Sequence, residues 1–221
     1  ETLSQNENVF IRPSAAGSTL GGVARKTRET IILCEAAGFD VLLIETVGVG
    51  QSEIMVHSMV DFFLLLLLAG AGDELQGIKR GIMEMADGLA VTKSDGENVH
   101  KAKLAARELK NAIHLFPPTS NGWIPEVLTC SSLENTDIDS VWEMIERFER
   151  HTKLNGSFET KRKHQDANWM HETLKDLLLQ GLWFHEKIRA YIGAKEAEVE
   201  NGKISAFEAA EEIYRLYRNI N

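Results

Sequence analysis

The sequence predicts an α/β fold, a mostly parallel sheet flanked by helices, with an α-helical extension at its C-terminal end. Short apolar runs that end in polar residues alternate with longer segments in which apolar residues recur at helical spacing. Such alternation is typical of a layered parallel sheet. Beyond about residue 155 the strand pattern stops and only helical spacing continues. We therefore expect two parts, residues 1–154 and residues 155–221.

Four apolar runs are predicted to be strands. Residues 41–45 form the first, which is expected to be buried and to end in Glu45. The run at 62–69 is too short for a transmembrane helix, which needs about 20 apolar residues. A run without polar residues is instead typical of a central parallel strand covered on both faces, here residues 62–68. The last two predicted strands are residues 89–92 and 127–130.

Helices are predicted between and after these strands. Residues 1–19 are expected to be irregular, because Pro13 restricts the residue before it, and Gly38 is expected to end the first helix. In the extension a long helix precedes a last helix, which begins at the capping box of Ser205 and Glu208. The helices of the first part are predicted at residues 21–37, 53–59, 78–86, 97–116 and 138–151.

Composition excludes several classes of function. The 221 residues carry a formal net charge of −9, which argues against a broad nucleic-acid footprint. The two cysteines, Cys34 and Cys130, form no Cys-x-x-Cys pair, and we expect free thiols in a reducing compartment. The seven histidines show no spacing typical of a zinc site. No signal peptide or membrane-spanning run is visible.

The first candidate site follows the strand predicted at residues 41–45. Ligands of open α/β sheets bind outside the carboxyl ends of the strands, where Glu45 and Gly48 would lie. A carboxylate at a strand end can hold Mg²⁺, and a glycine just beyond it lets a backbone N–H approach a phosphate. Taken alone, this Glu-x-x-Gly pattern is weak and is more typical of a plain strand–turn–helix with a surface glutamate.

A second motif follows the strand predicted at residues 89–92. Thr92-Lys93-Ser94-Asp95 resembles the guanine-specificity motif of G proteins, Asn-Lys-x-Asp, with Thr92 in place of the asparagine. There the aspartate accepts hydrogen bonds from the ring N–H and the exocyclic amine of guanine, and adenine lacks that pair of donors. After the last predicted strand, Ser131-Ser132-Leu133 resembles the Ser-Ala-x loop that completes the base pocket. Three motifs in this order, each at a strand end, favour a nucleotide site.

Two glycine-containing segments are weaker on the residues alone. Gly21 and Gly22 open a predicted helix, and the chain has no Gly-x-x-x-x-Gly-Lys-[Ser/Thr] phosphate loop. Residues 70–80 combine small and charged side chains, which predicts a solvated loop that leads into the next helix.

Longer runs extend the resemblance to one family. Residues 10–14, 19–23, 45–53 and 72–82 resemble the methylmalonyl-CoA mutase-associated GTPases of the MeaB/ArgK family, formerly called LAO/AO transport system kinases. This family belongs to the P-loop GTPases related to the signal-recognition-particle and nickel-chaperone GTPases. The resemblance implies a homodimeric G-protein chaperone that gates adenosylcobalamin delivery to methylmalonyl-CoA mutase and protects that enzyme. It also implies a location in the cytoplasm, or in the mitochondrial matrix of a eukaryote, and no membrane or nucleic-acid partner.

The resemblance assigns roles by position, with GTP or GDP and Mg²⁺ as ligands. Glu45 would serve the Mg²⁺ shell and Gly48 the γ-phosphate. For residues 70–80 the resemblance implies an additional switch toward the mutase instead of a plain solvated loop. The residues of this switch are Asp73, Gln76 and Lys79. The base-pocket residues are Thr92, Lys93, Asp95, Ser131, Ser132 and Leu133.

One position departs from the pattern of many G proteins. They place a water-orienting glutamine directly after the glycine of the second switch, where this chain has Val49. Gln51, two positions further on, is the candidate substitute. We therefore expect slow intrinsic hydrolysis that the partner accelerates.

By the resemblance, we expect the family's phosphate loop and the acidic residues of its first switch to precede the first residue of this sequence. We expect residues 1–221 alone to bind GTP poorly and not to hydrolyse it, because that loop supplies much of the phosphate affinity. Two alternative functions stay open. One is a metabolic kinase that acts on amino-acid transport proteins, and the other is a nucleotide-dependent scaffold in which hydrolysis is incidental.

Overall fold

The computed structural model describes residues 3–13, 20–46, 51–69 and 80–220. The chain forms two compact units, residues 1–165 and residues 166–221. The sequence pattern predicts a boundary at residues 154/155, whereas the contacts include the first turns of the long helix α7 (Ser157–Phe184) in the first unit. Among the described residues, no helix offers an apolar stretch long enough for a bilayer.

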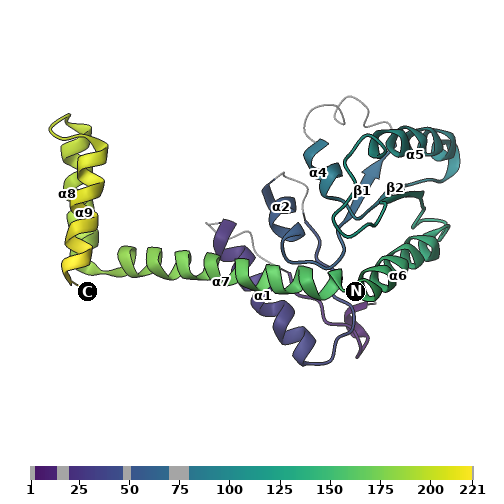
Figure 1. Ribbon diagram of the computed structural model, residues 1–221, viewed down its shortest axis with the longest axis horizontal. Helices are drawn as coiled ribbons and strands as arrows, with labels where there is room; N and C mark the ends of the chain where they lie inside the picture. The colour runs from purple at the N-terminus through teal and green to yellow at the C-terminus, as the bar shows by residue number, and fades with distance from the viewer. Residues whose placement is uncertain (1–2, 14–19, 47–50, 70–79, 221) are drawn as a thin grey trace. The chain divides into compact units, whose positions relative to one another are not determined.

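A three-stranded parallel sheet forms the centre of the first unit (Figure 1). Its strands are β1 (Leu64–Leu68), β2 (Gly88–Thr92) and β3 (Glu126–Thr129), in the order β1-β2-β3. The register aligns Leu66 with Ala90 and Ala90 with Leu128. The prediction of a parallel α/β sheet is therefore confirmed.

The central strand of the described sheet is β2. Leu89, Ala90 and Val91 are fully buried, since helices cover both faces of this strand. The prediction that residues 62–68 form the central strand, covered on both faces, is wrong. Within the described sheet β1 lies at the edge, and Leu66 is 59% exposed. A wholly apolar run indicates that a segment tends to be buried. It does not indicate the position of the strand in the sheet, because that position depends on which other strands pair with it.

The strand predicted at residues 41–45 is not a strand in the structure. Residues 41–46 have no regular structure, and Val41 and Leu43 are 51% and 87% exposed. An extended apolar segment becomes a strand only when a neighbour satisfies its backbone hydrogen bonds. Among the described residues no strand pairs with this segment, and the described partner of β1 is β2.

Two apolar layers fix β2 from opposite sides. On one face Leu89 and Val91 pack with α4 (Arg80–Met85) and with the buried side of α5 (Val99–Ile113). On the other face Ala90 packs with α6 (Ile138–Leu154), chiefly through Met144. Figure 1 shows α5 and α6 on opposite sides of the strands. The buried residues of α5 are Ala102, Ala106, Leu109 and Ile113.

The helices before β1 follow their predicted positions. α1 (Leu20–Ala36) ends where the N–H of Phe39 donates to the carbonyl of Cys34 and Gly38 takes φ +90°. This left-handed residue is the expected glycine stop. α2 (Gln51–His57) follows, and a 3₁₀ turn (Leu3–Gln5) lies near the start of the chain.

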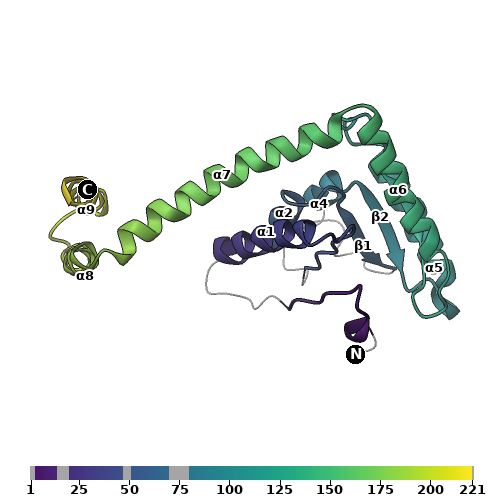
Figure 2. The same ribbon diagram turned by 90° about the horizontal axis from the view of Figure 1, so that it is seen from below.

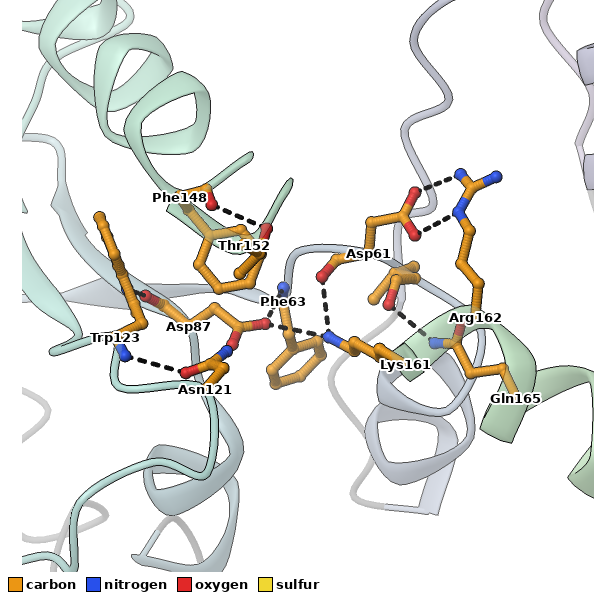
Figure 3. A network of polar contacts seen from close by, with 11 residues as sticks. Asp61, Phe63, Asp87, Asn121, Trp123, Phe148, Thr152, Lys161, Arg162 and Gln165 are labelled. Carbon is orange, nitrogen blue, oxygen red and sulfur yellow. Dashed lines mark hydrogen bonds and ion pairs between the residues drawn. The ribbon is translucent and has the colours of Figure 1, made fainter. Parts of the chain in front are cut away.

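A cluster of ion pairs anchors the start of α7 beside the amino ends of β1 and β2 (Figure 3). The Asp87 carboxylate, just before β2, accepts from the N–H of Phe63 at 2.9 Å and from Lys161 Nζ at 3.4 Å. Lys161 also donates to the carbonyl of Asp61 at 2.8 Å. Arg162 forms two hydrogen bonds with the Asp61 carboxylate and an ion pair with Glu35 of α1.

The charges of this cluster are partly desolvated. Burial raises the pKa of Asp87, and the Lys161 ammonium and the Phe63 N–H oppose part of that rise. Burial lowers the pKa of His57, and Lys161 lowers it further. Gln165 adds a bond from its amide to the carbonyl of Val60, so the first turns of α7 are bound to the first unit at several points.

The second unit consists of the remainder of α7 with α8 (Glu186–Glu200) and α9 (Ala206–Ile220). α7 is one continuous 28-residue helix (Figure 2). α8 and α9 lie side by side in both views and bury Ile188, Ile192 and Ala209. The predicted start of this last helix is confirmed, because Ser205 caps it by accepting the Glu208 N–H on its Oγ at 3.1 Å.

We predict that Gly88→Ala destabilises the protein by about 1–3 kcal/mol, the usual cost of overpacking a core. A Cβ at Gly88 would lie 2.7 Å from Met144 Cε and 2.7 Å from Phe62 Cζ. Gly81→Ala on α4 is the control, since nothing lies within 4 Å of its Cβ position and alanine favours a helix. Chemical denaturation measures both variants, and equal stability of the two would contradict the prediction.

We predict that Lys161→Met lowers the free energy of unfolding by about 2 kcal/mol at neutral pH, since it leaves the buried Asp87 carboxylate without its cation. The folded-state pKa of Asp87 is already above its usual 3.8 and would rise further. In the variant, folding therefore favours the protonated form of the Asp87 carboxyl, which needs no cation. The loss of unfolding free energy relative to the wild type should shrink as the pH falls toward 3.8.

Two variants control for side effects of this substitution. Lys163→Met removes a charge from an exposed position of the same helix and should be nearly neutral. The double variant Asp87→Asn/Lys161→Met buries no uncompensated charge and should recover part of the loss. A Lys161→Met variant as stable as Lys163→Met would show that the ion pair does not hold α7.

Candidate functional site

The carboxyl ends of β2 and β3 bring two predicted motifs together. β2 leads into Lys93, Ser94 and Asp95, and β3 leads into Cys130 and Ser131. The Cys130 N–H donates to the carbonyl of Val91 at 2.9 Å, and the Ser94 N–H donates to the carbonyl of Cys130 at 3.0 Å. The pairing of the two strands thus continues into the loops and holds them next to each other.

Asp95 and Ser131 form the contact at the centre of this site. Ser131 is fully buried, and its Oγ donates to Asp95 Oδ2 at 2.5 Å. The same Oγ accepts from the N–H of Glu134 at 3.1 Å, so the direction of the hydroxyl is fixed from both sides. A charge-assisted bond of this kind orients the carboxylate plane before any ligand arrives.

Thr92 and Lys93 differ in their surroundings. The Thr92 hydroxyl donates to the carbonyl of Leu67 at 3.1 Å, which links the ends of β2 and β1. Lys93 has an exposed side chain and a left-handed backbone, with φ +55°. The side chain that replaces the motif's usual asparagine therefore makes a contact between strands, while its role toward a ligand stays a prediction.

The loop after Ser131 is closed by its own backbone. Ser131 and Thr136 exchange two hydrogen bonds of 2.9 Å each, N–H to carbonyl in both directions. Ser132 and Leu133 lie on this loop and are exposed, Leu133 at 83%. A ligand at the strand ends could therefore reach the backbone of these two residues.

The other predicted site residues are only partly described. Glu45, the predicted magnesium ligand, is exposed and lies in the irregular segment 41–46, not at a strand end. Gln51 is the first residue of α2, and its side chain is outside the description. The rest fall among the undescribed residues, namely Gly48, Asp73, Gln76 and Lys79.

No metal cage is formed by the described part of the chain, where no three His, Cys, Asp or Glu side chains gather. Cys130 lies beside the site, but burial raises the pKa of its thiol, and Asp137 raises it further. A neutral, buried thiol is a packing residue and not a nucleophile. The Asp95 carboxylate and the loop backbone at these strand ends support recognition of a ligand by hydrogen bonds.

Sequence reasoning missed two contributors to the site. The backbone of Glu134 fixes the Ser131 hydroxyl, and nothing in the residue types signals that contact. Asn98 donates to the carbonyl of Lys93 at 2.7 Å. Asn98 falls in the first turn of the helix predicted at residues 97–116, where an asparagine is instead typical of an ordinary helix start.

Comparison with known proteins identifies relatives along most of the chain. Residues 1–187 match the model of the family described as methylmalonyl Co-A mutase-associated GTPase MeaB. A probable GTPase of Mycobacterium tuberculosis is 45% identical over 97% of this chain and 64% of its own length. The mitochondrial methylmalonic aciduria type A homolog of Mus musculus is 41% identical over 98% of this chain and 52% of its own length.

The fold is shared with solved structures, among them one of a related kinase. A crystal structure of an LAO/AO transport system kinase aligns with a TM-score of 0.74 and 34% identity, over 98% of this chain and 68% of that one. The present chain thus spans less than two thirds of the length of the curated relatives described above. The similarity includes the strands and loops that form the candidate site.

Proposed function

Because this chain belongs to the MeaB family of methylmalonyl-CoA mutase-associated GTPases, we propose that its first unit carries the guanine-recognition site of a GTP-binding protein. The observation that carries the proposal is the Asp95 carboxylate, held at the strand ends by the buried Ser131 hydroxyl. A pre-oriented carboxylate in a half-buried loop is suited to a planar ligand with two adjacent donors.

Guanine offers that pair of donors. Its ring N–H and exocyclic amine both point toward the acceptor that Asp95 provides, whereas adenine would leave the carboxylate unpaired. The Lys93 stem lies along the base, and the backbone of residues 131–133 receives the guanine oxygen. Thr92 supports this pocket by holding β2 to β1, in addition to any contact with the base.

The proposed reaction is slow hydrolysis of GTP. Mg²⁺ held at this site would supply neutralisation of the charge that develops on the phosphates. Glu45 would serve the ligand shell of that metal, Gly48 would serve the γ-phosphate, and Gln51 would orient the attacking water because Val49 cannot. The intrinsic rate is low until a partner positions these groups.

The proposed partner is an adenosylcobalamin-dependent methylmalonyl-CoA mutase. The protein gates delivery of the cofactor to the mutase and protects the enzyme, and Asp73, Gln76 and Lys79 form the contact that senses it. The family description and the name of the mouse relative support this choice.

A second copy of this chain is the other proposed partner, with residues 155–221 as the dimerisation arm. The second unit buries few side chains of its own and exposes many large apolar ones, which favours association with another helical surface. These exposed residues are Met170, Leu174, Leu177, Leu178, Leu179, Trp183, Phe184, Phe207, Tyr214 and Ile220.

We predict that Asp95→Asn in the full-length protein lowers affinity for GDP at least about 100-fold and makes xanthosine diphosphate the better ligand. The asparagine amide faces a donor in guanine but an acceptor in xanthine. Asp139→Asn, at an exposed position of α6, is the matched control and should leave both affinities unchanged. Titration calorimetry with the two nucleotides measures the switch, and an unaltered GDP affinity would exclude the guanine site and favour the alternative of a kinase that uses ATP.

We predict that methylmalonyl-CoA mutase raises GTP turnover of the full-length protein about tenfold or more, the scale expected when a partner completes a catalytic site. Phosphate release with and without the mutase measures this effect, and Gln76→Ala should reduce the stimulation without changing the basal rate. Complex formation with GDP and with a non-hydrolysable GTP analogue separates binding from turnover. A basal rate that already equals the stimulated rate would contradict the proposal and leave a scaffold role.

A further inference from the structure

Asn98 makes an unusual contact for a residue that precedes a helix. It occupies the N-cap position of α5, yet its side chain makes no capping bond to that helix. Its amide Nδ2 instead reaches back along the chain and donates to the carbonyl of Lys93 at 2.7 Å. An asparagine normally stabilises a helix start by accepting a backbone N–H on its side-chain oxygen. The Asn98 side chain makes no such bond and therefore does not cap α5.

The recipient of that bond is a strained residue. Lys93 has φ +55°, a left-handed conformation that a residue with a side chain adopts only when its surroundings enforce it. Thr92 before it is held to β1, and the Ser94 N–H after it is held to Cys130. The Asn98 amide supplies the bond to the Lys93 carbonyl itself.

Asn98 also holds the residue that reads the base. Its backbone N–H donates to the carbonyl of Asp95 at 2.9 Å, while its side chain holds Lys93. The loop from Lys93 to Asp95 is therefore closed by one residue at both ends. Ser131 fixes the Asp95 carboxylate from the neighbouring strand, and Asn98 fixes the backbone from which that carboxylate extends.

We propose that Asn98 is a positioning residue for base specificity, whose side-chain amide holds the Lys93–Asp95 loop in the conformation that lets Asp95 meet both donors of guanine. The proposal rests on the proposed function, since it requires Asp95 to bind a base. Asn98 itself touches no part of the nucleotide and acts through the backbone of Lys93 and Asp95.

Asn98→Asp separates this role from a purely structural one. Aspartate has the shape of asparagine, is an equally good N-cap residue and favours a helix N-terminus through its charge, so the variant should fold. It lacks the amide donor and presents an oxygen to the Lys93 carbonyl. Asn98→Ala removes the donor without adding charge. Asn111→Asp, at an exposed position of the same helix, controls for the added charge.

The experiment compares GDP with inosine diphosphate, which lacks only the exocyclic amine of guanine. Titration calorimetry on the full-length protein gives the ratio of the two dissociation constants, and thermal unfolding reports stability. Both nucleotides carry the same phosphates, so an added charge near the site cancels from the ratio. We expect the preference for GDP to fall about fivefold in both Asn98 variants, the scale of one hydrogen bond, and to stay unchanged in Asn111→Asp.

Two results would overturn the inference, and they are distinguishable. A wild-type preference for GDP that survives in both Asn98 variants would leave Asn98 a structural residue while the proposed function stands. A wild-type protein that binds the two nucleotides equally would refute the proposed guanine site, and the inference with it. Equal weakening of both nucleotides in the variants counts as the first result, since the ratio does not change.

Discussion

The burial of β2 on both faces is the constraint on which the rest of the first unit depends. Leu89, Ala90 and Val91 are fully enclosed between α5 on one side and α6 on the other. A strand enclosed in this way cannot slip in register without moving its whole apolar set. The positions of its two ends are thereby fixed, and the polar residues at the two ends have different roles.

The two ends of β2 separate anchoring from recognition. Asp87, just before the strand, takes part in the ion-pair cluster that binds the first turns of α7. Lys93 and Asp95, just after it, belong to the candidate base site. The five-residue strand β2 thus connects the residues that bind the first turns of α7 to the loop proposed to bind guanine. The core around β2 is closely packed, and a closely packed core transmits strain because it is hard to compress.

Much of the fold was predictable because its signals are local. Helical spacing located α1, α5, α6 and α9 to within a few residues, and Gly38 and Ser205 marked a helix end and a helix start. Residues 41–45 and 62–68 gave the errors. Both runs are apolar, and only the second forms a strand, because whether such a run pairs, and where in the sheet, depends on neighbours distant in sequence.

The sequence by itself determined the alternation of elements and the family resemblance, and it predicted the base-site residues, because motifs at strand ends are contiguous in the chain. Only the tertiary structure decided that Ser131 donates to Asp95, that Asn98 holds Lys93, and that Asp87 receives Lys161. Two of these contacts join residues 36 and 74 positions apart. In the third, Asn98 makes no capping bond to α5 and donates instead to Lys93, which has a left-handed backbone. These contacts depend on the packing of β2, because the packed core determines which polar groups lie within hydrogen-bonding distance of each other.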